Sequence, residues 1–179
     1  MKVFFSILSL LICSIILTFF IGCFYSYNYP MKYKEEIMTY SKEFNIDGAI
    51  IASVANVESN FREEVESNKG AIGVMQLLPS TAEWIANKLD EDYDVENLKK
   101  ADYNLKLGSY FLSYLINYFD DMELGICAYN AGQGNVRSWL KDKHYSKDGK
   151  KLDFIPFNET KNYLNKVLKS YNYYKNRYN

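Results

Sequence analysis

Residues 3–24 restrict the fold of this chain more than any other stretch, because these 22 consecutive positions contain no charged residue. About 20 apolar residues in a helix are enough to cross the hydrocarbon core of a bilayer. A cleavable signal peptide has a shorter apolar region, about 7–15 residues, behind a more basic start. Lys2 is the only charged side chain before this stretch. We therefore expect residues 1–26 to form an uncleaved signal-anchor helix.

Two other ways in which this segment could be processed remain open. Gly22-Cys23 fits lipoprotein processing at Cys23, although Phe20 is a poor match three residues before the cysteine. Ordinary cleavage is the second alternative. All three fates place the rest of the chain outside the cytoplasm and close to a membrane. The lone Lys2 on the cytoplasmic side agrees weakly with this orientation.

Residues 27–179 are enough for one domain with a hydrophobic core. Without Lys2 they carry 20 Lys and Arg against 22 Asp and Glu, a balance that argues against nucleic-acid binding. Cys127 is the only cysteine outside the apolar segment, so we expect no internal disulfide and a buried thiol. The 17 Tyr and 11 Phe residues include candidates for stacking on sugar rings.

The hydrophobic pattern predicts an all-α domain, because no run with strand periodicity exceeds a few residues. Asp47, Asp121 and Asn158 are expected to cap helices, Ser80 and Glu83 to form a capping box, and Gly132 and Gly134 to stop a helix. Residues 59–72 are expected to form a loop, and residues 89–98 an acidic surface segment. The expected helices and helical turns are 31–44, 48–57, 74–78, 81–89, 101–119, 122–130, 136–140 and 159–174.

Glu58 is the first candidate for chemistry, because it directly follows an apolar helix that the sequence predicts to be buried on nearly every side. Burial and the negative end of the helix dipole both disfavour the carboxylate and raise its pKa. A carboxyl that stays protonated near neutral pH is suited to act as a general acid on a glycosidic bond. The alternative is a polar residue at the end of an ordinary helix.

Three further segments make the case for Glu58 stronger. The sequence contains Glu58-Ser59, then residues 73–76 (GVMQ), 128–132 (AYNAG) and 156–160 (PFNET) followed by Tyr163. In this order they resemble the motifs of the family 1 lytic transglycosylases, the catalytic domain of the soluble lytic murein transglycosylases. The resemblance covers about residues 38–174. It departs at Val74 in place of Leu, Val65 in place of Ala, and Leu78 in place of Met.

The resemblance implies a lysozyme-like helical domain, similar to goose-type lysozyme, that cleaves peptidoglycan between N-acetylmuramic acid and N-acetylglucosamine. Glu58 would protonate the glycosidic oxygen and then, as a carboxylate, deprotonate the muramyl 6-hydroxyl to give a 1,6-anhydro end. No metal or other cofactor is implied. Met75 could instead belong to the core, and Asn130 could support the backbone of its motif. The implied substrate-binding residues are Ser59, Ser67, Met75, Gln76, Tyr129, Asn130 and Glu159.

A hydrolytic muramidase and a non-catalytic glycan-binding module are the alternatives. Most hydrolases need a second carboxylate opposite the acid. Glu159 is implied in sugar binding, and the other candidates (Glu63, Glu64 and Glu66) are expected to be solvated. The presence of Glu58 argues against a module without activity. We expect a monomeric enzyme whose partners are glycan strands and, through its N-terminal helix, the cell membrane, with the catalytic domain on the cell-wall side.

Overall fold

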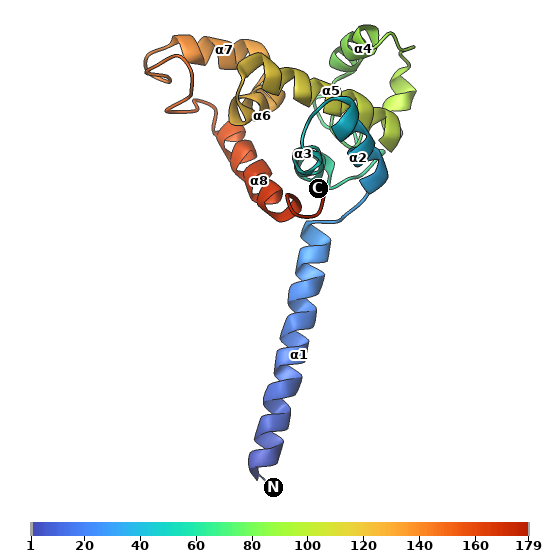
Figure 1. Ribbon diagram of the computed structural model, residues 1–179, viewed down its shortest axis with the longest axis vertical. Helices are drawn as coiled ribbons and strands as arrows, with labels where there is room; N and C mark the ends of the chain where they lie inside the picture. Colours follow the sequence, from blue (N-terminus) through green and yellow to red (C-terminus); the bar gives the residue numbers. More distant parts are fainter. Residues whose placement is uncertain (1, 179) are drawn as a thin grey trace. The chain divides into compact units, whose positions relative to one another are not determined.

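The computed structural model describes residues 2–178, with side chains at residues 4 and 7 and from residue 10 onward. The chain divides into two compact units, Met1–Met31 and Lys32–Asn179. Within the described residues all regular elements are helices (Figure 1). They are α1 (Lys2–Asn28), α2 (Lys34–Glu43), α3 (Gly48–Ser59), α4 (Pro79–Lys88), the 3₁₀ helix η1 (Val95–Lys99), α5 (Ala101–Phe119), α6 (Met122–Ala131), α7 (Gln133–Lys141) and α8 (Asn158–Tyr174).

The first unit consists mainly of α1, a helix of 27 residues. Its segment Leu10–Asn28 is long and apolar enough to cross a membrane. Large apolar side chains such as Leu17, Phe19 and Phe20 are exposed along it. An isolated helix with an apolar surface of this size is suited to a lipid environment.

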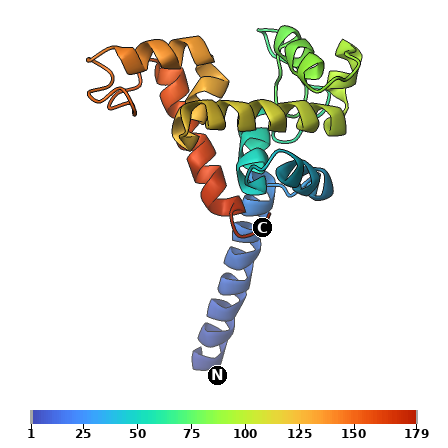
Figure 2. The ribbon, with the colours of Figure 1, turned by 45° about the horizontal axis from the view of Figure 1, so that its top comes forward.

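In the second unit, the amphipathic helix α5 crosses the whole domain (Figure 2). The elements α4 and η1 pack against one part of it, and α2, α3 and α6 pack against others. Helix α8 contacts both α3 and α6. The sequence pattern predicted α5 with its observed bounds, because its apolar residues recur at helical spacing over five turns.

Helix α3 is the buried centre of this unit. Residues 48–55 are all buried, as the continuous apolar run indicated. The Asp47 carboxylate accepts a hydrogen bond from the backbone N–H of Ala49 at 2.8 Å, which confirms the predicted cap. Asp121 caps α6 in the same way, through the N–H of Leu124. Cys127 on α6 is buried and free, also as predicted.

Two of the expected local structures were wrong near residue 80. Residues 73–76 form a turn instead of a helical turn, because the flanking Ile72 and Leu77 pair as an isolated antiparallel bridge. Helix α4 begins at Pro79 with Leu78 as its N-cap, so the capping box at Ser80 does not form. Proline is favoured at the first helical position, where its missing N–H costs no hydrogen bond.

Three other predictions also differ from the structure. Gly132 has a φ of 88° and ends α6, but Gly134 lies inside α7. Asn158 is the first residue of α8, and Phe157 occupies the cap position without a side-chain cap bond. The segment expected at the surface, residues 89–98, contributes the fully buried Leu98 to a core beneath α4.

Residues 174–178 pack within the second unit and contact its first residue, Lys32. Tyr174 and Tyr178 are fully buried, and their rings pack edge to face at 5.4 Å. The Tyr178 hydroxyl donates to the carbonyl of Lys32 at 3.0 Å. The first and last described residues of this unit are therefore held together.

Candidate active site

Glu58 lies in the last turn of α3, which continues two residues beyond the predicted end. Asn60 and Phe61 follow with positive φ angles of 55° and 59°, so the chain turns away sharply after the helix. Phe61 is fully buried and anchors this turn. Arg62 donates through its Nε to the carbonyl of Ser59 at 2.8 Å, which satisfies one of the helix's terminal carbonyls.

Burial raises the pKa of Glu58 from 4.5 to about 7. The Tyr163 hydroxyl donates to Glu58 Oε1 at 2.6 Å, and this hydrogen bond lowers the pKa in opposition to burial. Desolvation is the larger effect, so Glu58 holds its proton up to neutral pH. Once the proton has left, the same hydrogen bond stabilises the carboxylate.

The GVMQ segment forms the turn that faces Glu58. Gly73 has a φ of 82°, and a Cβ atom there would lie 2.3 Å from both Asn104 Nδ2 and the Leu98 carbonyl. Asn104, fully buried on α5, accepts from the N–H of Met75 at 2.7 Å and donates to the carbonyls of Ile72 and Leu98 at 2.9 Å. Only glycine at position 73 permits this close approach between the turn and α5.

Gln76 has a positive φ of 49° and stabilises the turn from within. Its Nε2 donates to the carbonyls of Val65 and Gly73, both at 2.9 Å. The Ser67 hydroxyl accepts from the N–H of Ala71 at 3.0 Å in the neighbouring loop. The loop before α4 is thus held by its own side chains.

Four hydrogen bonds connect the four sequence motifs in space. The Ser59 hydroxyl donates to the carbonyl of Val74 at 2.7 Å, and the Tyr129 hydroxyl donates to the carbonyl of Met75 at 2.8 Å. The Thr160 hydroxyl donates to Asn130 Oδ1 at 2.8 Å, and Tyr163 donates to Glu58. Segments up to 105 residues apart therefore form one closed circuit around the Glu58 carboxyl.

A cavity of about 370 Å³ opens at this circuit. It brings together six of the eight site residues predicted from the sequence. Those six are Glu58, Ser67, Gln76, Tyr129, Asn130 and Glu159. Asn68, Lys69, Ala71 and Leu78 complete the lining.

The other two predicted residues, Ser59 and Met75, do not line the cavity. Ser59 is buried with its hydroxyl bonded to Val74, and Met75 is fully buried against Gly108 of α5. Met75 therefore occupies the core, which was its alternative placement. Tyr129 lines the cavity as expected, and its hydroxyl donates to the Met75 carbonyl.

Sequence reasoning did not identify the partners of two acidic residues in the cavity. Tyr163 was noted only as the end of a motif, although it is the hydrogen-bond donor to Glu58. Lys69 Nζ lies 3.3 Å from Glu159 Oε1, and both side chains are mostly exposed. A contact across 90 residues of chain has no local signal in the sequence.

The two carboxyls of the cavity have different environments. Glu58 is desolvated, whereas the Glu159 side chain is 70% exposed and paired with a lysine. Glu63 and Glu64 line a separate depression beside Tyr33. The cavity therefore offers one protonated acid, one solvated carboxylate paired with Lys69 and several hydrogen-bonding groups, a combination suited to a polar substrate.

Comparison with known proteins identifies relatives of this chain. The sequence model of the family described as "Transglycosylase SLT domain" matches residues 35–152. The chain is 30% identical over 151 residues to the soluble lytic murein transglycosylase of Salmonella typhimurium. This match covers 82% of this chain and 23% of that protein. It is 34% identical over 116 residues to the membrane-bound lytic murein transglycosylase D of Escherichia coli, covering 63% and 25%.

Solved structures share the helical fold. An inactive mutant of the lytic transglycosylase Slt from Pseudomonas aeruginosa, with a glutamate replaced by glutamine, superposes with a TM-score of 0.76 at 29% identity. It covers 86% of this chain and 25% of that one. The 70 kDa soluble lytic transglycosylase of Escherichia coli, in complex with bulgecin A, gives 0.74 at 27% identity and covers 83% and 25%. The chain thus spans about a quarter of the length of these relatives.

Proposed function

Because this chain belongs to the transglycosylase SLT domain family, we propose that it is a membrane-anchored lytic transglycosylase acting on peptidoglycan. The observation that carries the proposal is the partly buried Glu58 carboxyl, with its raised pKa, within the circuit of hydrogen-bonded motifs. The bond cleaved is the β-1,4 linkage between N-acetylmuramic acid and N-acetylglucosamine. The relatives named as lytic murein transglycosylases support this substrate class.

In the proposed first step, protonated Glu58 donates its proton to the glycosidic oxygen, and the bond from that oxygen to C1 of the muramyl sugar breaks. The substrate's own N-acetyl group assists the departure of the leaving sugar. Burial supports this role of Glu58, because a carboxyl with a pKa of about 7 is still partly protonated at neutral pH.

In the second step, the Glu58 carboxylate takes the proton from the muramyl 6-hydroxyl, whose oxygen then bonds C1. The product is a 1,6-anhydro ring, and no water is consumed. The Tyr163 hydroxyl stabilises the carboxylate between the two steps through its 2.6 Å hydrogen bond. One carboxyl therefore serves in turn as acid and base.

The exposure of Glu159 favours this route over hydrolysis. A carboxylate that is 70% exposed and paired with Lys69 is suited to binding sugar hydroxyls at the edge of the cavity. Ser67, Gln76, Tyr129 and Asn130 would line the path of the glycan. Ser59 and Met75 would act indirectly, by holding the turn that carries Gln76.

We also propose that α1 crosses the cell membrane and keeps the catalytic domain on the cell-wall side. The length and composition of Leu10–Asn28 support this placement. The relatives whose names include "membrane-bound" support it as well. An anchored enzyme would act only on peptidoglycan close to the membrane.

Mass spectrometry of the soluble fragments released from purified peptidoglycan tests the proposal. The full chain in detergent should release fragments with 1,6-anhydro ends, one water lighter than muramidase products, and Glu58→Gln should release none. Full-mass reducing ends would instead identify a hydrolase. Glycan binding without release by either protein would identify a non-catalytic module.

A further inference from the structure

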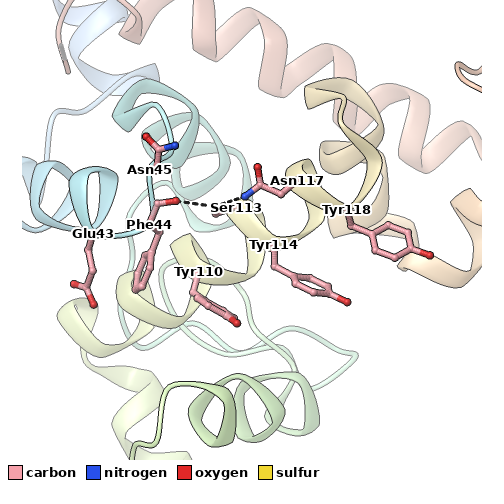
Figure 3. A pocket seen from close by; sticks show the side chains of 8 residues that line it. All are labelled: Glu43, Phe44, Asn45, Tyr110, Ser113, Tyr114, Asn117 and Tyr118. Atoms are coloured by element: carbon pink, nitrogen blue, oxygen red, sulfur yellow. Dashed lines mark hydrogen bonds between the residues drawn. The ribbon is translucent and has the colours of Figure 1, made fainter.

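A second cavity, of about 490 Å³, lies between the end of α2 and the outer face of α5 (Figure 3). It shares no residue with the cavity at Glu58. Its lining is aromatic and amide-rich. The lining residues are Glu43, Phe44, Asn45, Tyr110, Ser113, Tyr114, Asn117 and Tyr118.

Three tyrosines form one wall of this cavity. Tyr110, Tyr114 and Tyr118 follow each other at intervals of four residues, so they lie along one side of α5, as Figure 3 shows. They extend over about 12 Å of the helix axis. Tyr118 is 45% exposed, and the other two are partly exposed. The row offers flat apolar faces on which successive sugar rings can stack.

The polar groups around these rings are available to a ligand. Among the described residues, no hydrogen bond engages the hydroxyls of the three tyrosines or the side chains of Glu43 and Asn45. In contrast, the Ser113 hydroxyl donates to the carbonyl of Phe44 at 2.8 Å and accepts from Asn117 at 3.2 Å. These bonds fix the cavity wall and leave the groups that face outward unpaired.

The charge of the lining argues against an anionic ligand. Glu43 is the only ionisable acid or base in it apart from the tyrosine hydroxyls, and no Lys or Arg is present to bind a phosphate or carboxylate. Aromatic faces combined with amide and carboxylate acceptors suit a ligand that has both C–H faces and hydroxyl groups. A pyranose has both.

A continuous series of ring contacts connects this cavity to the first one. Tyr129, which lines the Glu58 cavity, has its ring centroid 5.4 Å from that of Phe111. Phe111 lies 6.3 Å from Trp84, and Trp84 lies 5.2 Å from Tyr114. The two cavities therefore belong to one aromatic region of α4, α5 and α6.

We propose that the second cavity is an accessory binding site for N-acetylated β-1,4-linked glycan, separate from the catalytic cavity. The identity of the ligand rests on the proposed function. The site would hold the enzyme on wall glycan while the Glu58 cavity engages and releases its substrate. Tyr114 and Tyr118 provide the stacking faces, and Asn45 and Glu43 bind hydroxyl groups.

Calorimetric titration with the pentamer of N-acetylglucosamine tests this proposal. The protein is the full chain in detergent, with Glu58→Gln present to prevent cleavage. Two classes of site are expected. Tyr118→Ala combined with Asn45→Gly should weaken one class by about tenfold and leave the other unchanged. Both positions are exposed, and glycine tolerates the positive φ of 49° at position 45, so the variant should keep its thermal midpoint.

Tyr145→Ala is the matched control, because Tyr145 is a partly exposed tyrosine stacked on Phe154 outside both cavities. It should leave both classes of site intact. A single class of site that the double variant does not change would overturn the proposal, as would equal losses in the control. Release of 1,6-anhydro products, measured with Glu58 present, reports separately on the proposed function.

Discussion

At the level of single residues, burial and hydrogen bonding act on Glu58 in opposite directions. Burial favours the protonated acid, and the Tyr163 hydroxyl favours the carboxylate. The sequence predicted the first effect, because an apolar run precedes Glu58. It gave no sign of the second, because the donor lies 105 residues away. The chemistry of this carboxyl therefore depends on the packing of α8 against α3.

The raised pKa of Glu58 predicts that stability depends on pH. Between pH 4.5 and about 7 the folded protein keeps a proton that the unfolded chain releases. Its contribution to stability is therefore complete below pH 4.5 and is lost as pH rises toward 7, a difference on the order of 3 kcal/mol. Glu58→Gln should remove this dependence, as measured by chemical unfolding between pH 4.5 and 8. An unchanged pH profile would contradict the raised pKa.

Tyr163→Phe removes the hydrogen bond that lowers the pKa of Glu58. We expect the pKa of Glu58 to rise above its value in the parent and the alkaline limb of the pH–rate profile to shift upward. The rate itself should fall by about 10- to 100-fold, because the carboxylate intermediate loses a charge-assisted donor.

Tyr171→Phe is the control for this change, because Tyr171 on the same helix donates instead to Asp47 at 2.7 Å. A rate loss in Tyr163→Phe without any shift of the pH profile would mean that the hydroxyl does not lower the pKa of Glu58.

At the level of elements, periodicity and capping predicted most helices, but not the turn that forms the site. Asp47 and Asp121 cap their helices through local bonds, which short-range patterns encode. The turn at residues 73–76 depends on Asn104, a polar residue buried in the middle of α5. Nothing near Asn104 in the sequence distinguishes it from an exposed asparagine, so its role emerges only from the tertiary contact.

Gly73→Ala and Gly70→Ala form a matched pair that tests this turn. Both glycines have positive φ angles, 82° and 76°, so alanine at either position should cost about 1–2 kcal/mol. Only at Gly73 would the added Cβ collide with α5, at a further cost of about 1–3 kcal/mol. Thermal unfolding and peptidoglycan release measure both variants. Equal losses in the two would show that α5 does not restrict the turn.

At the level of the whole molecule, the sequence predicted an all-α domain and the convergence of four motifs, which the structure places around one cavity. It did not separate the residues that line the cavity from those that support it. Ser59 and Gln76 belong to neighbouring motifs, yet one is buried and the other lines the cavity. Motif matching identifies which positions belong to the site, but the exposure of each side chain depends on the packed backbone.

The proposed anchor predicts how the chain partitions in cells. A chain with residues 1–179 should stay in the membrane fraction after alkaline extraction. Leu17→Lys with Phe20→Lys should release much of it, because each lysine costs about 2.5–3.5 kcal/mol at the centre of a membrane helix. Phe154→Lys, at an exposed apolar position of the domain, is the control and should remain bound.

Cys23→Ser separates the two modes of attachment. If α1 itself anchors the protein, this variant stays in the membrane fraction. Release of Cys23→Ser would instead indicate attachment through a lipid on Cys23.

The hydrogen bond between Tyr178 and Lys32 has a consequence for how such a domain can be reused. When the two ends of a folded unit meet, the unit can be inserted into a surface loop of another protein, or reconnected to begin elsewhere, with little change to its core. Gene fusion would then need only a short connection on either side. Here the unit follows a single apolar helix, whereas matching units make up about a quarter of the relatives' much longer chains.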